Sequence, residues 1–251
     1  MINMQLSAET RSVTERTHAL IAPDGLVSSI LPEWNGCDVN IIINRSMGAR
    51  FTQTLITAKE NCMLTGHDKE SQVFFYLIQG KAKVTVDNNH KLMSDGHFVY
   101  IPINKEYTFK EISAGSQFIT FHKVYESIEN HIAPSVLFGE ASSIKSGSFL
   151  NDKALQLQLL LPDHLSFDMA VNIFTYEPGG HLPFVETHVM EHGLTFLQGQ
   201  GIYRLADRWY PVQKGDHIWM APYCQQWFTA MGKEKAVYIY YKNVNRFPGK
   251  I

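Results

Sequence analysis

Long apolar runs and concentrated positive charge are both missing from this chain of 251 residues. No apolar stretch approaches the ~20 residues that a membrane-spanning helix needs. The opening, MINMQLSAETRSVTERTHALIAP, lacks the apolar core of a signal peptide. A formal net charge of −2 supplies no basic face for a phosphate backbone. We therefore expect a cytoplasmic protein with neither a membrane nor a nucleic acid as its partner.

Cysteine is scarce as well. Cys37, Cys62 and Cys224 are odd in number and widely spaced, so the sequence predicts no disulfide framework, which suits a reducing compartment. Sustained helical periodicity of apolar residues is also scarce. Hydrophobic residues nevertheless make up 45% of the chain, which is enough for a substantial globular core.

The chain is rich in short segments of aromatic and β-branched residues, separated by Gly, Pro, Asn and Asp. The segments are 51–58, 73–79, 81–86, 97–102 and 117–124, followed after residue 150 by 155–161, 168–176, 194–198, 217–222 and 236–242. Short strands at regular spacing are typical of a barrel or sandwich. The sequence therefore predicts an all-β protein.

An internal repeat relates the two halves of the chain. Gly80 is followed by Gly96 after sixteen positions, and Gly199 is followed by Gly215 at the same interval. An offset of 119 superposes both pairs and also places the segment FITFHK on VYIYYK. A constant offset across separate segments indicates two copies of one fold.

Each copy also fits the cupin pattern, in which a cluster of metal-ligand side chains precedes two glycines and a Pro-containing turn. Cupins are similar to jelly-roll barrels and hold a metal inside with inward-facing side chains. We therefore predict a bicupin of two tandem jelly-roll-like β-barrels. The first, with a leading segment, occupies residues 1–130 and has no metal site; the second, at 131–251, carries the metal and the active site. The polar stretch 126–150 is the predicted linker.

The segment VETHVMEHG is the densest cluster of metal-ligand residue types in the chain. Glu186 and His188 lie two residues apart, so on a strand they face the same side. With His192, they occupy three cupin ligand positions, and Gln226 occupies the fourth. One carboxylate, two imidazoles and an amide oxygen suit Mn²⁺, Fe²⁺ or a similar divalent ion. Zinc fits less well, because an amide is not among its usual ligands.

The first copy provides an internal comparison. At the same offset its four positions are His67, Lys69, Val73 and Tyr107, which cannot form an equivalent metal site. Lys123 falls on Lys242, but we expect its replacement to have little effect, because its barrel lacks the metal beside which a lysine would work.

A motif typical of a different enzyme class occurs within the same cluster. His188, Glu191 and His192 form H-x-x-E-H, the inverted zinc-peptidase signature. That chemistry needs a helix, so that both histidines share one face. Pro183 before the motif and Gly193 after it instead predict turn and strand, which favours the cupin interpretation.

Four stretches of the chain resemble one family. They are APDGLV (22–27), ETHVMEHG (186–193), GQGIYRLADRWYPVQKGDHIWMAPYCQQW (199–227) and YIYYKNVNR (238–246). The chain resembles the (S)-ureidoglycine aminohydrolases of purine (allantoin) catabolism, most densely in its C-terminal third. The Glu-x-His-x-x-x-His arrangement with Gln at the fourth position is more specific than a generic cupin motif.

The resemblance implies both a cofactor and a substrate site. It implies Mn²⁺ held by Glu186, His188, His192 and Gln226, with substrate contacts from Tyr203, Tyr238, Lys242 and Glu186. The implied reaction converts (S)-ureidoglycine and water to (S)-ureidoglycolate and ammonia. We assign catalytic roles to Glu186, as a candidate proton carrier, and to Lys242, whose cation suits a small anionic ureido substrate.

Two other classes of function stay open from the sequence. Two histidines and a carboxylate also suit an Fe(II) cupin dioxygenase, which oxygen uptake would reveal. A bicupin that only binds a small molecule or stores nitrogen would show no turnover. Because barrel sheets leave exposed faces, we also expect a homo-oligomer.

Overall fold

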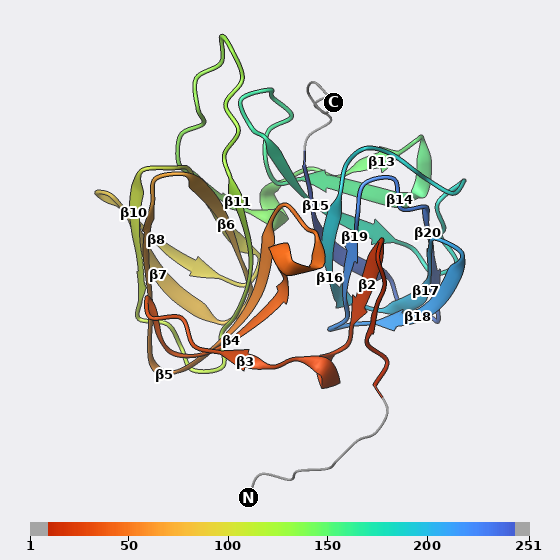
Figure 1. Ribbon diagram of the computed structural model, residues 1–251, viewed down its shortest axis with the longest axis horizontal. Helices are drawn as coiled ribbons and strands as arrows, with labels where there is room; N and C mark the ends of the chain where they lie inside the picture. The colour runs from red at the N-terminus through yellow and green to blue at the C-terminus, as the bar shows by residue number, and fades with distance from the viewer. Residues whose placement is uncertain (1–9, 244–251) are drawn as a thin grey trace, which may run out of the picture.

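The computed structural model describes residues 10–243, and nearly all of its regular structure is strand (Figure 1). Two β-barrels lie side by side, one coloured orange to green and the other teal to blue in Figure 1. The prediction of an all-β, two-barrel protein is confirmed. Residues 1–9 of the leading segment and 244–246 of the YIYYKNVNR stretch lie outside the described residues. Within the described range, no helix combines the length and apolar character needed to cross a membrane.

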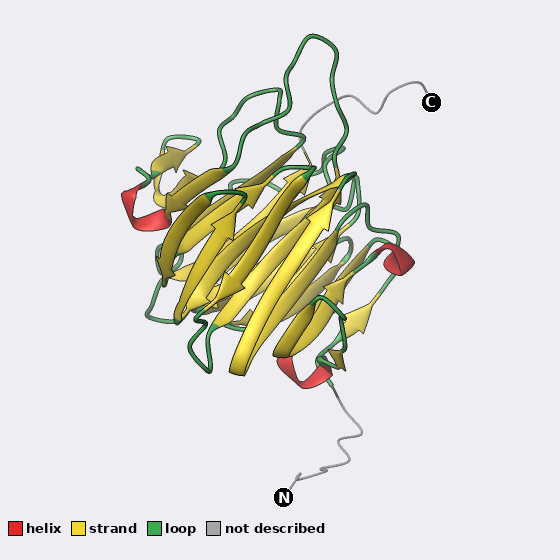
Figure 2. Ribbon diagram, turned by 90° about the vertical axis from the view of Figure 1, so that its left-hand side faces the viewer, coloured by secondary structure: helices red, strands yellow, loops and turns green. Residues whose placement is uncertain are grey.

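The N-terminal barrel is a curled antiparallel sheet in the order β12-β9-β6-β11-β5-β10-β7-β8, with β3 and β4 joined beside β5. Its strands are β3 (Ser28–Ser29), β4 (Trp34–Ile43), β5 (Thr52–Asp68), β6 (Ser71–Gln79), β7 (Lys81–Val86), β8 (Asn89–Ser94), β9 (His97–Ile101), β10 (Lys105–Lys110), β11 (Gln117–Val124) and β12 (Leu137–Glu140). The long β5 pairs with β11 near its start and with β10 near its end, so one strand serves both sides of the barrel. Figure 2 shows these strands running alongside one another, with the 3-10 helices η1 (Pro23–Gly25), η2 (Arg45–Met47) and η3 (Ala141–Ser143) at the margins.

The interior of the N-terminal barrel is apolar and filled. Phe75 packs against Phe109 with ring centroids 4.6 Å apart, within a cluster of aliphatic and aromatic side chains. Val73 and Tyr107, which stand where the second copy has His192 and Gln226, belong to this cluster.

The C-terminal barrel consists of two sheets. An eight-stranded sheet has the order β1-β2-β19-β16-β21-β15-β14-β13, and a three-stranded sheet has the order β18-β17-β20. The strands are β1 (Val13–Thr14), β2 (His18–Ile21), β13 (Gly147–Phe149), β14 (Asp152–Leu159), β15 (Met169–Tyr176), β16 (His192–Gln198), β17 (Gln200–Leu205), β18 (Arg208–Gln213), β19 (His217–Met220), β20 (Gln226–Met231) and β21 (Ala236–Asn243). Side chains from both sheets form one buried cluster between them.

Strand pairing crosses the expected division at residue 130 in both directions. The early strand β2 pairs with β19 of the C-terminal barrel, whereas β12, which follows residue 130, pairs with β9 of the N-terminal barrel. The two barrels therefore exchange short edge strands, and the boundary itself remains a prediction. The prediction of an irregular linker at 126–150 is wrong in part, because this stretch contains β12 and β13.

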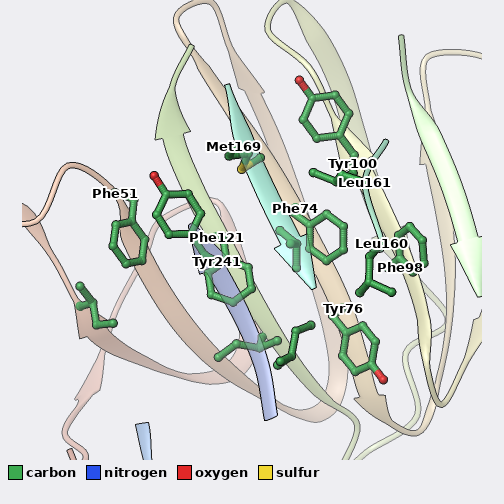
Figure 3. Close-up of a cluster of buried hydrophobic side chains, with 14 of the residues drawn as sticks. Phe51, Phe74, Tyr76, Phe98, Tyr100, Phe121, Leu160, Leu161, Met169 and Tyr241 are labelled. Carbon is green, nitrogen blue, oxygen red and sulfur yellow. The ribbon is translucent and has the colours of Figure 1, made fainter. Parts of the chain in front are cut away.

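A third apolar core lies between the barrels. Figure 3 shows its side chains projecting from strands of both halves, with Phe51 and Tyr241 among them. Their rings stack with centroids 4.0 Å apart. At Gly193 on β16 a Cβ atom would lie 2.5 Å from both Gln53 Oε1 and the Phe51 ring, so glycine is required for this close approach.

The pairing of the last strands corrects the repeat offset. Val73 lies opposite His122 of β11, whereas its counterpart His192 lies opposite Lys242 of β21. The counterpart of Lys242 is therefore His122, one residue away from Lys123. Because neighbouring residues of a strand face opposite sides, Lys242 faces its barrel interior and Lys123 faces the other barrel.

Lys123 instead forms a buried ion pair between the barrels. Its Nζ lies 2.6 Å from Oδ2 of Asp168, and the two side chains are 4% and 2% exposed. Asp168 also accepts hydrogen bonds from the Gln72 amide and from the backbone N–H of Glu126. The expectation that replacing Lys123 has little effect on catalysis stays a prediction, but we expect an effect on stability, because its removal would leave a buried carboxylate without its cation.

We predict that Lys123→Met lowers the free energy of unfolding by about 3–5 kcal/mol, as expected when one partner of a buried pair is removed. Urea denaturation measures the change. Adding Asp168→Asn should recover much of the loss, because the amide oxygen can still accept hydrogen bonds. Lys105→Met is the control: its ion pair with Asp87 is 39% exposed on each side and should contribute under about 1 kcal/mol. Equal stabilities for the two single variants would contradict the prediction.

Candidate active site

The C-terminal barrel encloses a cavity of about 220 Å³ between its two sheets. Every predicted site residue lines it: Glu186, His188, His192, Tyr203, Gln226, Tyr238 and Lys242. The remaining wall is mostly apolar and includes Phe149, Phe174, Leu182, Leu194 and Met220. Seven residues that are scattered over 57 positions of the sequence thus share one cavity, with polar groups set against an apolar wall.

An irregular loop and three strands position the polar groups. Glu186 is fixed to Gln226, the first residue of β20, by two backbone hydrogen bonds of 2.8 and 2.9 Å. The loop then leads into β16, whose first residue, His192, pairs with Lys242 of β21. Because 185–191 is a loop and His192 begins a strand, the helix required by the inverted peptidase motif is absent from this segment.

The two imidazoles meet edge to edge. His188 Nε2 lies 3.1 Å from His192 Nε2, and the ring planes are nearly perpendicular, at 89°. Each Nδ1 faces a backbone carbonyl, that of Met190 for His188 and that of Tyr241 for His192. A carbonyl only accepts hydrogen bonds, so each Nδ1 carries the proton of a neutral ring and each Nε2 is unprotonated, with a lone pair available.

Burial keeps both rings neutral. Burial, together with the nearby His188 and Lys242, lowers the pKa of His192 to about 3, although the Tyr241 carbonyl opposes the shift. Burial also lowers the pKa of His188. The short contact between the Nε2 atoms therefore has no proton to share at neutral pH.

This donor arrangement fits a divalent cation. Two lone pairs at 3.1 Å repel each other unless a positive centre lies between them. Two nitrogens that each lie about 2.1 Å from one ion, at a right angle, are about 3.0 Å apart. Hydrogen bonds from each Nδ1 to a carbonyl are also the usual way in which proteins orient metal-binding histidines.

Gln226 connects the imidazoles to a tyrosine cluster. Its amide Nε2 lies 2.9 Å from His188 Nε2, and its Oε1 accepts a hydrogen bond of 3.2 Å from the Tyr203 hydroxyl. The nitrogen therefore faces the histidines, and ligation through Oε1 would require the amide to turn. Beyond Tyr203, the hydroxyls of Tyr238 and Tyr176 lie 2.9 Å apart.

Glu186 and Lys242 place opposite charges in the cavity. Burial raises the pKa of Glu186, and the Lys242 cation opposes that rise. Glu186 lines the same cavity as the histidines, but across residues 10–243 no three His, Cys, Asp or Glu side chains are grouped closely enough to hold a metal by themselves. The structure thus brings His188, His192 and Gln226 into contact and leaves the Glu186 carboxylate in the same cavity without such a contact.

Sequence reasoning missed three polar residues near the cavity. Tyr176 is hydrogen-bonded to Tyr238, Tyr240 lines the cavity, and Asn172 lies opposite Tyr240 on β15. The alternation of Tyr238, Tyr240 and Lys242 on one strand was a usable signal for Tyr240, but the pairing that brings Asn172 beside it cannot be read from sequence.

Known proteins from three organisms are similar to this chain along almost its full length. An Arabidopsis thaliana (S)-ureidoglycine aminohydrolase is 33% identical over 95% of this chain and 80% of its own. An Escherichia coli (S)-ureidoglycine aminohydrolase is 33% identical over 96% of this chain and 94% of its own. An Oryza sativa protein described as "Probable (S)-ureidoglycine aminohydrolase" is 36% identical over 95% of this chain and 77% of its own.

The chain belongs to the (S)-ureidoglycine aminohydrolase family. No general family model matches it. Among solved structures, the E. coli protein Ylba is 32% identical, covers 96% of this chain and 97% of its own, and superposes with a TM-score of 0.86. Bacillus subtilis oxalate decarboxylase, at 10% identity over 91% of this chain and 78% of its own with a TM-score of 0.70, shares the fold alone. The predicted bicupin fold is thereby confirmed for this family member.

Proposed function

We propose that this protein is a metal-dependent hydrolase that converts (S)-ureidoglycine and water to (S)-ureidoglycolate and ammonia in purine (allantoin) catabolism. The observation that carries the proposal is the cavity in which the unprotonated Nε2 atoms of His188 and His192 converge beside Glu186 and Lys242. Membership of the family supports the choice of substrate. The cytoplasmic location and homo-oligomeric state remain predictions from the sequence.

The proposed cofactor is Mn²⁺, held by Glu186, His188, His192 and Gln226. Nitrogen and oxygen donors without thiolate favour such an ion. When bound, it would supply a Lewis acid that lowers the pKa of water and polarises an oxygen of the substrate. Glu186 would complete the set from the cavity wall, and Gln226 would do so after turning its amide oxygen inward.

The remaining cavity residues would bind and orient the substrate. The Lys242 ammonium suits the substrate carboxylate through a charge-assisted hydrogen bond. Tyr203 and Tyr238 line the same cavity, where their hydroxyls would contact the substrate's polar atoms. Holding the carboxylate and the ureido group at fixed points would present one face of the reacting carbon to water.

Glu186 is the proposed proton carrier. The reaction breaks the bond from carbon to the amino nitrogen and forms a carbon–oxygen bond, while a proton passes from water to the departing nitrogen. Burial raises the pKa of Glu186 toward the range in which a carboxyl group can both accept and return a proton. The apolar wall, including Phe174 and Leu182, would exclude excess water from the cavity.

We predict that the purified protein releases ammonia stereospecifically from (S)-ureidoglycine generated in situ. Chelation should lower the rate at least ~100-fold, because a Lewis acid contributes several kcal/mol to such a step. Mn²⁺ should restore it best among divalent ions. Coupled ammonia detection and circular dichroism of the product measure both rate and stereochemistry. If metal-replete protein leaves the spontaneous, non-stereoselective decay unchanged, the proposed function is wrong.

A further inference from the structure

One buried amide beside the cavity has only a side-chain interaction with Tyr240, short of normal hydrogen-bond geometry. Asn172 is 1% exposed, and neither its Oδ1 nor its Nδ2 makes a hydrogen bond of normal geometry within the described residues. Leaving both ends of an amide unpaired in a protein interior is unfavourable. The interaction with Tyr240 explains an amide at this position better than packing does, since leucine has a similar volume and no polar atoms.

The strand register places this amide against Tyr240. Asn172 on β15 is the direct partner of Tyr240 on β21, so their side chains share one face with Cβ atoms about 5 Å apart. Phe174, two residues along β15, lines the cavity, which shows that this face points into the barrel. Asn172 itself does not line the cavity, whereas Tyr240 beside it does.

On β21, Tyr240 lies between Tyr238 and Lys242, two of the proposed substrate contacts. Its ring packs on His192 with centroids 5.6 Å apart and on Tyr238 at 5.8 Å. Lys242 is two residues away on the same face, a spacing of about 6.7 Å along a strand. The Tyr240 hydroxyl interacts with the Asn172 side chain, and a phenol carries its proton at physiological pH.

We propose that Tyr240 is a further substrate-binding residue that recognises the neutral ureido group, with Asn172 as the residue that positions its hydroxyl. A neutral hydroxyl backed by a neutral amide can both donate to a carbonyl and accept from an NH₂ group. A ureido group presents both, whereas the carboxylate is better served by the Lys242 cation. This inference rests on the proposed function, because it assigns one end of that substrate.

Binding of two product-like ligands tests the assignment. (S)-Ureidoglycolate carries the ureido group, and glycolate carries the same hydroxy acid without it. Tyr240→Phe keeps the ring against His192 and deletes only the hydroxyl. We expect it to raise the Kd for (S)-ureidoglycolate about tenfold, as for the loss of a neutral hydrogen bond that leaves a partner unpaired, and to change the Kd for glycolate less than about twofold. Isothermal titration calorimetry of the metal-loaded protein measures both, with metal content checked in parallel.

A double-variant cycle separates positioning by Asn172 from a purely structural role. Asn172→Leu should also raise the Kd for (S)-ureidoglycolate, and combining it with Tyr240→Phe should add little, because both changes remove one contact. If the double variant instead raises the Kd by the product of the two single effects, about 100-fold, the positioning role is overturned. Asn172→Ala serves if the leucine variant fails to fold, and Tyr76→Phe, in the N-terminal barrel, is the control for loss of a buried phenol.

The outcomes distinguish this inference from the proposed function. If the wild type and Tyr240→Phe bind (S)-ureidoglycolate with equal Kd, only the inference is overturned. Wild-type protein that binds neither ligand would overturn the proposed function, and the inference with it.

Discussion

Replacing His188 with alanine is expected to abolish metal binding and ammonia release together. Its Nε2 carries one of two lone pairs that meet at 3.1 Å, so its loss removes a donor that no neighbouring side chain can replace. Loss of a group that only orients a ligand already lowers metal affinity about 10–100-fold, and loss of a ligand should exceed that. Elemental analysis of protein purified without chelator should show about one divalent ion per wild-type chain and almost none in the variant.

Stability gives this prediction a second, independent readout. In chelated protein, His188→Ala removes the hydrogen bond from the Gln226 amide together with the repulsion between the two Nε2 lone pairs, so the melting temperature should change little. Metal should raise the melting temperature of the wild type and leave that of the variant unchanged, because only a bound ligand stabilises the folded state.

A nearby histidine supplies the matched control. His181 bonds the backbone carbonyl of Leu182 and packs on Trp227, outside the cavity lining. His181→Ala should keep both metal and activity. Retention of metal after His188→Ala combined with His192→Ala would place the metal elsewhere and end the interpretation of this cavity as the metal site.

The sequence was a good guide where neighbouring residues decide the structure. Alternating apolar residues and Gly-bounded segments predicted ten of the strands, nine of them within a few residues at each end, because each strand must bury one face. The internal repeat predicted two barrels, and it also predicted correctly that Val73 and Tyr107 stand where His192 and Gln226 do. These inferences needed only local pattern and spacing.

The same repeat failed at the last strand, for a physical reason. The second copy takes one residue more from Gln226 to Tyr238 than the first copy takes between the equivalent Tyr107 and Phe118, and a fixed offset cannot follow that change. A slip of one residue in a strand exchanges its two faces. Lys123 was therefore matched with Lys242, although it faces Asp168 in the core between the barrels.

The pairing of strands that are distant in the chain also could not be predicted from the sequence. Nothing local in the HALI segment of β2 indicates that it completes the C-terminal barrel by pairing with β19, before the chain enters the N-terminal barrel. The partners of buried polar groups, such as Asn172 and Tyr240, depend on such pairing as well. Residue types and spacing predicted which side chains could form the site, but only the fold gives their partners.

Lys242→Met should separate substrate binding from metal binding. Lys242 is paired with His192 across β16 and β21 and lines the cavity, yet it is not a metal ligand. Methionine keeps the apolar stem and deletes the charge, so metal content should stay near that of the wild type. The value of kcat/KM should fall at least ~100-fold, corresponding to about 3 kcal/mol for a lost charge-assisted contact.

Lys235→Met, just before β21, is the control for this change, since its ion pair with Glu177 is on the surface and it does not line the cavity. Lys235→Met is a better control than Lys123→Met, because the expected loss of stability in Lys123→Met would obscure any effect on catalysis. Steady-state kinetics with metal-replete proteins, normalised to metal content, measure the difference. If Lys242→Met and Lys235→Met retain equal activity, Lys242 is a solvated lysine at a strand end, and the substrate carboxylate must be held by another group.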